Sequence, residues 1–285
     1  MITYIKTEKQ KKLKKVKYFF TVLNGGIKVE YFIIHASDLH LYEAWESRSK
    51  IKQFISEIND YYPNLLVITG DLTHNGLEPE IIEIKELLDE IICPKIIIPG
   101  NHDAKSWGWK FFEEYIGPRK IKYEDNYVTL LAMDSSTPDL AEGHIGRENY
   151  PIIEETFANS NGKIKIFASH HHLVPVPQTG REKAVLTDSG DVLEILIKTG
   201  VNLSLCGHRH VPWVWQLEKM VINHTGTVGS LRIRGARENY YSLLQIKDQE
   251  IDISLKAVGG KEKVFKEAFF NKTLKKSCPI KIYTP

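Results

Sequence analysis

Five short apolar runs in this chain each end abruptly in polar residues that can bind metal ions. Continuous apolar runs of this length are typical of strands that are covered on both faces. With the polar residues that follow them, the runs read YFIIHASDLHL, NLLVITGDLTHNG, KIIIPGNHD, KIKIFASHHH and NLSLCGHRH in chain order. A chain with this pattern has to bury several strands and still present polar side chains at the end of each one.

Helical patterns lie between these runs. Apolar residues recur at helical spacing in residues 47–61, 79–92 and 191–198. Strand and helix in alternation predict an α/β fold with the helices outside the sheet. From about Trp213 onward the sequence predicts successive hairpin-like strands. No repeat or linker divides the chain, so we expect residues 29–285 to form a single domain with closing β strands and a basic C-terminal tail.

The five polar clusters are expected to converge on one site, because ligands of open α/β sheets bind beyond the carboxyl ends of the strands. A D-x-H or H-x-H spacing places alternate side chains on one side of an extended segment, where both can reach one ion. Imidazole and carboxylate together favour Zn, Mn or Fe over Ca or Mg alone. The candidate ligands at the strand ends are Asp, Asn and His without cysteine, which argues against a structural zinc site.

The order of the clusters resembles a known family pattern. DLH, GD, GNHD, HHH and GHRH follow one another from about Phe32 to His210. This series is similar to that of the calcineurin-like metallophosphoesterase superfamily, and most like its bacterial class III cyclic-nucleotide phosphodiesterases. The resemblance implies a four-layer αββα sandwich with a dinuclear metal centre between two sheets. The ions would be divalent or trivalent Mn, Fe or Zn, and their identity stays open.

The resemblance also implies roles for individual residues. One metal ion would be held by Asp38, His40 and His210. The other would be held by Asn101, His170 and His208, with Asp71 as the bridge between the two ions. His102 and Asp103 would be catalytic: His102 would stand over the substrate phosphate and leaving group, and Asp103 would orient it.

Two points in this assignment stay open. Any of His170, His171 and His172 could be the ligand, and we take His170 because the family ligand directly follows the strand. Other polar residues near predicted strand ends are expected to be solvated or to form loop hydrogen bonds; they are His74, Asn75, His144, Arg147 and Arg209.

The implied reaction is hydrolysis of a phosphodiester, such as a cyclic nucleotide or another small phosphodiester, by a hydroxide that bridges the two metal ions. The partner would then be a small phosphoester substrate. Two alternatives remain: a non-catalytic scaffold with the same fold, and a nuclease or phosphomonoesterase of the same superfamily.

Charge and cysteine content limit the other classes of function. Residues 1–28 carry a net charge of +7 and residues 256–285 carry +6, which leaves −11 for residues 29–255 of the total of +2. An acidic body is not the electrostatic pattern of a nucleic-acid-binding protein. The three cysteines form no close-spaced pattern, so a reducing cytoplasm is expected. No apolar run reaches the roughly 20 residues that a membrane span needs.

Residues 1–28 are predicted to be a basic N-terminal extension, with two interpretations. They are either a flexible tail or a translated leader that precedes a functional start at Val29. The second interpretation rests on the stretch from Gly25 to Val29, which can be encoded by a ribosome-binding site, a short spacer and a GTG start codon.

Overall fold

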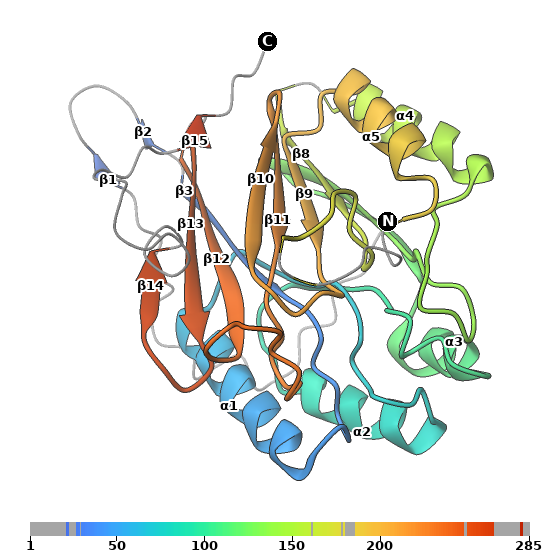
Figure 1. The fold of residues 1–285 in the computed structure, drawn as a ribbon. Helices are drawn as coiled ribbons and strands as arrows, with labels where there is room; N and C mark the ends of the chain where they lie inside the picture. Colours follow the sequence, from blue (N-terminus) through green and yellow to red (C-terminus); the bar gives the residue numbers. More distant parts are fainter. Residues whose placement is uncertain are drawn as a thin grey trace, which may run out of the picture.

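Two β-sheets lie face to face in the middle of the molecule, and helices cover their outer faces (Figure 1). A computed structural model describes residues 21–22, 27–28, 30–160, 162–177, 179, 186–247, 250–264 and 280–281. The prediction for residues 1–28 therefore lies almost entirely outside the described residues. Of that segment, Thr21–Val22 (β1) and Ile27–Lys28 (β2) pair with each other as antiparallel strands.

The first sheet combines a parallel half with an antiparallel half. Its strands follow the order β14-β13-β12-β3-β4-β5, and β15 also pairs with β13. Their bounds are Glu30–Ala36 (β3), Leu65–Ile68 (β4), Lys95–Ile97 (β5), Tyr240–Lys247 (β12), Glu250–Ala257 (β13), Glu262–Val264 (β14) and Ile280–Lys281 (β15). Strands β3, β4 and β5 run parallel, so their carboxyl ends lie at one edge.

The second sheet has its parallel strands in the centre. The order is β10-β11-β9-β8-β7-β6, in which β11, β9, β8 and β7 run parallel and the two outer strands are antiparallel. The bounds are Lys120–Glu124 (β6), Val128–Met133 (β7), Ile164–Ala168 (β8), Leu203–Cys206 (β9), Trp213–Leu217 (β10) and Met220–His224 (β11).

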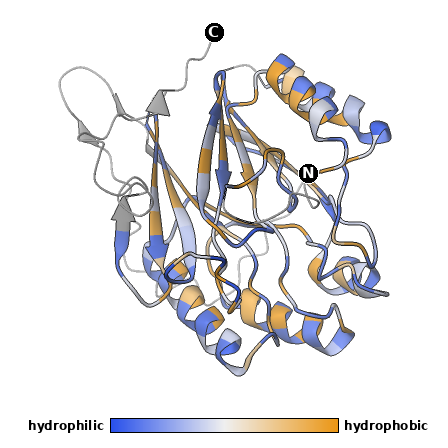
Figure 2. Ribbon diagram, viewed as in Figure 1, coloured by the Kyte–Doolittle hydropathy of each residue, from blue (hydrophilic) through white to orange (hydrophobic). Residues whose placement is uncertain are grey.

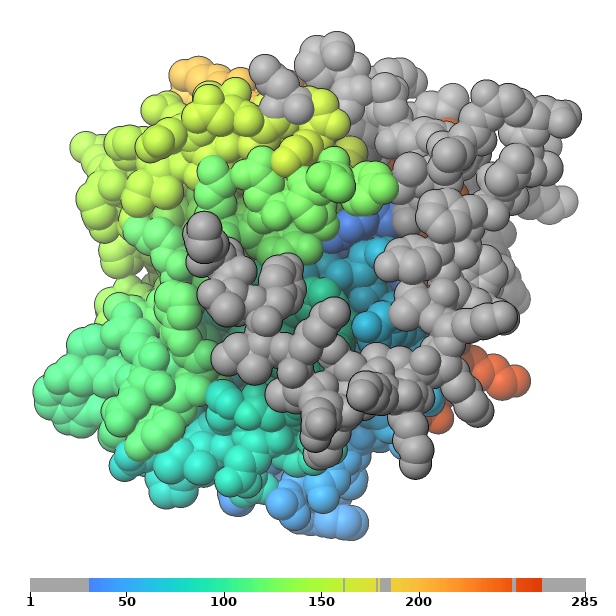
Figure 3. All heavy atoms as spheres, turned by 180° about the vertical axis from the view of Figure 1, so that it is seen from behind, coloured from blue at the N-terminus to red at the C-terminus, as the bar shows by residue number. Residues whose placement is uncertain are grey.

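The helices that connect the strands form the two outer layers. Trp45–Tyr61 (α1) and Glu78–Asp89 (α2) pack on the first sheet, and Tyr150–Ala158 (α4) and Ser189–Lys198 (α5) pack on the second. The turn of α-helix Gly108–Phe111 (α3), the π-helical turn Phe112–Ile116 and the 3-10 turn Arg147–Asn149 complete the helical segments. Figure 3 shows the opposite face, over which the teal segment of α2, the green segment of α3 and the yellow-green segment of α4 lie. No helix in the described part of the chain has the length and apolar character that a membrane crossing requires.

Burial explains why the central strands are apolar on both faces. In β3, Ile33 packs in the core between the two sheets, whereas its neighbour Ile34 packs against α1 and α2. In β4, Val67 likewise packs in the core between the two sheets, and Ile68 packs on the side of α1 and α2. Figure 2 shows the resulting apolar colour along the strands and on the sheet-facing sides of the helices. The four-layer αββα sandwich predicted from the sequence is confirmed.

We expect Phe54→Ala to lower the free energy of unfolding by about 3–5 kcal/mol. Phe54 is fully buried between α1 and the first sheet, and its ring centroid lies 5.2 Å from that of Tyr241. The matched control is Trp45→Ala on the same helix, because Trp45 is 83% exposed and its loss should change stability by less than about 0.5 kcal/mol. Urea unfolding of the two variants measures both values, and equal destabilisation would contradict the assigned packing.

Candidate metal centre

The predicted site residues come from loops that directly follow parallel strands of both sheets. Asp38 and His40 follow β3, Asp71 follows β4, and Asn101 follows β5. From the second sheet, His170 follows β8, and His208 and His210 follow β9. Because these strand ends face one another across the two sheets, the predicted convergence on one site takes place.

The backbone at this site adopts a conformation that side chains rarely tolerate. Five of the candidate ligands have positive φ: Asp38 (57°), His40 (46°), Asp71 (51°), His208 (70°) and His210 (60°). A positive φ is uncommon for residues other than glycine, and such strain tends to gather at functional sites. The surrounding fold therefore holds these side chains in place at an energetic cost.

One group of three buried side chains contains Asp38, His40 and His210. His210 Nε2 lies 3.1 Å from Asp38 Oδ1 and 3.1 Å from His40 Nε2. His40 Nε2 lies 3.7 Å from the same carboxylate oxygen. Three atoms that could bind one metal ion thus lie close together.

A second group gathers Asp71, Asn101, His170 and His208. Asn101 Oδ1 lies 3.2 Å from His170 Nε2 and 3.0 Å from His208 Nδ1. The two imidazole nitrogens are 3.2 Å apart. This is the second set of residues that the sequence predicts to share an ion.

The carboxylate of Asp71 joins the two groups. Its Oδ2 lies 3.6 Å from His40 Nε2 in the first group and 3.4 Å from His170 Nε2 in the second. Its Oδ1 accepts a hydrogen bond of 2.8 Å from the backbone N–H of His102. Asp71 therefore has the position that a bridging carboxylate requires.

The electrostatics of the two groups fit bound cations. Asp38 Oδ1 is buried and has no hydrogen-bond partner among the described residues. Burial favours the neutral form of Asp38, but His210, His40 and His170 together outweigh burial and hold the pKa of the carboxyl well below its ordinary value. Burial acts against the charged form of His170, but Asp71, Asp38 and the Thr69 carbonyl together outweigh it and raise the pKa of this imidazole to about 9. Buried carboxylates and imidazoles that face one another are a donor set suited to Zn, Mn or Fe.

Carbonyl groups orient two of the imidazoles. His170 Nδ1 donates to the carbonyl of Thr69 at 2.7 Å, and His210 Nδ1 donates to the carbonyl of Arg232 at 2.8 Å. In the neutral imidazole, each bond places the proton on Nδ1, so that Nε2 has the lone pair that binds a cation.

His102 lies beside the two groups. Its ring packs edge-on against His40 with centroids 4.7 Å apart, and its Nδ1 lies 2.7 Å from the carbonyl oxygen of His74. Lys105 Nζ lies 2.9 Å from the same ring nitrogen. Nδ1 either donates to the carbonyl or accepts from Lys105, and in both cases Nε2 is the atom left for a substrate.

Asp103 connects the loops of the site in a way that sequence analysis does not anticipate. Its buried carboxylate accepts hydrogen bonds from the backbone N–H groups of Leu72, Thr73 and Gly100 and from the Thr73 hydroxyl, at 2.9–3.0 Å. Among the described contacts, the carboxylate makes no hydrogen bond to the ring of His102. Asp103 therefore affects His102 only by joining the loop after β4 to the loop after β5.

The three consecutive histidines have different surroundings. His170 lies against Asp71 and Asn101 in the second group. His171 lies 2.9 Å from Ser135 Oγ through Nδ1 and 3.1 Å from the carbonyl of Ala141 through Nε2. His172 is buried further away, and its ring stacks on His208 at 5.8 Å. Of the three, His170 has the position that the sequence assignment requires.

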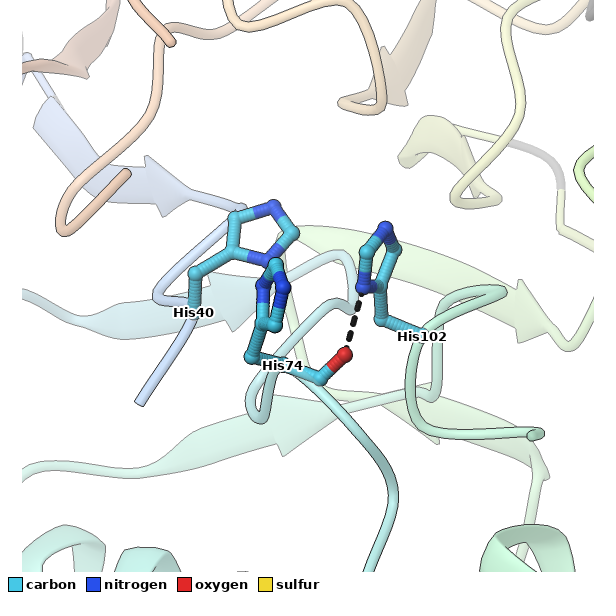
Figure 4. Close-up of side chains that lie close together, drawn as sticks. All are labelled: His40, His74 and His102. Atoms are coloured by element: carbon cyan, nitrogen blue, oxygen red, sulfur yellow. Dashed lines mark hydrogen bonds between the residues drawn. The ribbon is translucent and has the colours of Figure 1, made fainter. Parts of the chain in front are cut away.

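His74 is expected to be solvated or to form loop hydrogen bonds, and its backbone does bond to Leu41 and Lys105, but its ring also lies beside the metal centre. The ring of His74 packs beside the rings of both His40 and His102, with centroid distances of 5.6 Å and 5.0 Å (Figure 4). Arg209 is also buried, and its Nε donates to Thr179 Oγ1 at 3.1 Å. The proximity of His74 to the GD motif is the only sequence signal that points to the site.

Gly100→Ala should damage the centre because there is no room for a side chain. A Cβ at this position would lie 2.2 Å from Asp71 Oδ1 and 2.8 Å from His170 Cε1. We expect a loss of bound metal and a destabilisation of about 1–3 kcal/mol from overpacking. Gly190→Ala is the control, since a Cβ there meets nothing within 4 Å. Metal analysis and denaturant unfolding check both; wild-type metal content in G100A would contradict the close packing.

The sequence from 33 to 212 matches the family model of the calcineurin-like phosphoesterases, and the chain therefore belongs to this family. A probable cyclic nucleotide phosphodiesterase of Rhodococcus erythropolis is 27% identical over 199 residues; the match covers 64% of this chain and 65% of that protein, less than two thirds of its length. A glycerophosphodiester phosphodiesterase of Enterobacter lignolyticus is 25% identical over 200 residues, with 62% and 70% covered. The structure of a dimetal phosphatase from Danio rerio has the same fold, with a TM-score of 0.66 at 8% identity over 89% of this chain and 99% of that one.

Proposed function

We propose that this protein is a metal-dependent phosphodiesterase that hydrolyses a small phosphodiester at a centre of two metal ions. The observation that carries the proposal is the position of Asp71 Oδ2, within 3.6 Å of one group of donor atoms and 3.4 Å of the other. Membership of the calcineurin-like phosphoesterase family supports it.

In this proposal, each ion has its own set of ligands. Asp38, His40 and His210 hold one ion. Asn101, His170 and His208 hold the other, and Asp71 contributes to both. When bound, two such ions activate a water molecule as the nucleophile and neutralise the charge that develops on the phosphoryl oxygens.

The chain's own residues orient the substrate and move a proton. His102 Nδ1 either donates to the His74 carbonyl or accepts from Lys105, and in both cases Nε2 is the atom that donates a proton to the leaving oxygen when it carries one. The carboxylate of Asp103 ties together the two loops that carry Asp71 and His102, which fixes the distance between them.

The substrate class follows from the relatives. Cyclic nucleotides and glycerophosphodiesters are the substrates that the names of the two enzyme relatives give, and both are small phosphodiesters. The acidic charge of residues 29–255 disfavours a nucleic acid as substrate, because a polyanion would be repelled.

The test compares a diester with a monoester. Purified protein is loaded with Mn, Fe or Zn and assayed with bis(p-nitrophenyl) phosphate and p-nitrophenyl phosphate, followed by cyclic AMP and glycerophosphocholine. We expect hydrolysis that depends on added metal and a higher kcat/KM for the diester. A preference for the monoester would favour a phosphomonoesterase instead. Protein that binds no metal and hydrolyses neither ester would favour a non-catalytic scaffold.

A further inference from the structure

His40 lacks the outer partner that two other candidate ligands, His170 and His210, have. Histidines that bind metal ions usually donate their second ring N–H to a carbonyl, carboxylate or water, which fixes the tautomer and the ring orientation. His170 and His210 have such carbonyl partners at Nδ1. His40 presents Nε2 to the same site, but its buried Nδ1 has no hydrogen-bond partner in the described part of the chain.

The ring of His74 lies next to this nitrogen. Nδ1 of His74 is likewise buried and has no partner among the described residues. One nitrogen of each of the rings of His40, His74 and His102 lies within 4.8 Å of the others (Figure 4). Two polar groups that both need a partner thus share one small space beside the metal centre.

The backbone fixes the place of His74. Its N–H donates to the carbonyl of Leu41 at 2.9 Å, one residue after His40. Its own carbonyl lies 2.7 Å from His102 Nδ1 and accepts a hydrogen bond of 2.7 Å from Lys105. The loop that carries His74 is therefore attached on one side to the segment of His40 and on the other to His102.

We propose that His74 is a positioning residue for His40, and that one water molecule joins the Nδ1 atoms of the two rings. The two Nδ1 atoms make no direct hydrogen bond with each other, and a water molecule that makes two bonds of about 2.8 Å can join two nitrogens that are too far apart for one. The water accepts the proton of His40 Nδ1 and donates to His74 Nδ1, so that Nε2 of His40 keeps its lone pair for the metal ion. The inference rests on the proposed metal centre.

Metal retention tests the inference separately from catalysis. Protein loaded with two Zn²⁺ per chain is exposed to a chelator at increasing concentration, and the metal that remains is measured. His74→Leu removes the ring nitrogens and should weaken the binding of one ion by about 10–100-fold, the usual cost of losing an outer-shell partner. The other ion should be retained as in the wild type. His40→Ala, which removes a ligand, identifies which ion is affected.

Two further variants locate the effect at one atom. In His74→Asn, the side-chain amide takes the place of imidazole Nδ1, so this variant should recover most of the retention. In His74→Gln, the amide reaches the place of Nε2 and should recover little. The control is His144→Leu, because His144 is exposed and its Nδ1 lies 3.2 Å from Thr137 Oγ1; this variant should retain both ions.

The outcomes separate this inference from the proposed function. If the wild type does not retain two ions, the metal centre itself is wrong. If the wild type retains two and H74L retains them equally well, only the role of His74 is wrong. The role of His74 would also be wrong if H74N retained metal as poorly as H74L, or if H74L lost both ions equally easily. It would be wrong as well if the wild type bound a third ion that H74L loses.

Discussion

Asp71→Ala should lose both metal ions and, with them, hydrolytic activity. The Asp71 carboxylate lies close to both groups of candidate ligands, with Oδ2 3.6 Å from His40 Nε2 and 3.4 Å from His170 Nε2. Without it, two cations a few ångströms apart would repel each other with no shared negative charge between them. We expect activity to fall by more than about a hundredfold, since loss of a mere outer-shell partner already costs 10–100-fold.

Metal content and activity have to be measured on the same samples of this variant. Elemental analysis after dialysis gives the ions per chain, and bis(p-nitrophenyl) phosphate gives the rate. Asp60→Ala is the control, because Asp60 is exposed at the end of α1 and should behave as the wild type. Two ions per chain in D71A would show that Asp71 is not the bridge.

The strands that carry the site could be predicted because they are apolar on both faces. Ile33 and Ile34 in β3 point into different cores, so the run is continuously apolar and stands out from its surroundings. The short spacings in DLH and GHRH then indicate which side chains reach one ion. Predicted helices also agree with α1, α2 and α5 to within a few residues.

Strands β6 and β7 and helix α4 do not emerge from the sequence in the same way. Strand β6 alternates between exposed and half-buried residues, and no cluster of metal-binding residues follows β7. The sequence does predict that hairpins follow Trp213. The sequence does not predict that β10 and β11 join the second sheet whereas β12 and β13 join the first. The sheet that each hairpin joins depends on contacts between segments that are distant in sequence.

The hydrogen-bond and packing partners of individual side chains depend on loop conformation. The spacing of residues within a motif does not predict that conformation. Asp103 is next to His102 in sequence, but its carboxylate binds backbone groups of the neighbouring loop. His74 resembles any exposed loop histidine until the turn after β4 brings its ring against His40. In both cases the deciding contact joins two loops that are about 30 residues apart.

His102→Ala should keep both ions and still lose most of its activity. Nδ1 of His102 bonds to the His74 carbonyl or to Lys105, and the ring packs edge-on against His40 rather than within either group of candidate ligands. General acid help is typically worth about a hundred- to ten-thousandfold, so turnover should fall by that order.

The leaving group decides what His102 contributes. An ester of an acidic phenol needs little proton donation and should lose least in H102A, whereas an alkyl or ribose ester should lose most. The measurement compares the wild type and H102A across diesters of graded leaving-group pKa, with metal content determined on each sample. Loss of one ion would make His102 a ligand. Full metal content with the same loss for every leaving group would assign His102 to substrate positioning, because a contact that only holds the phosphate does not depend on the basicity of the oxygen that leaves.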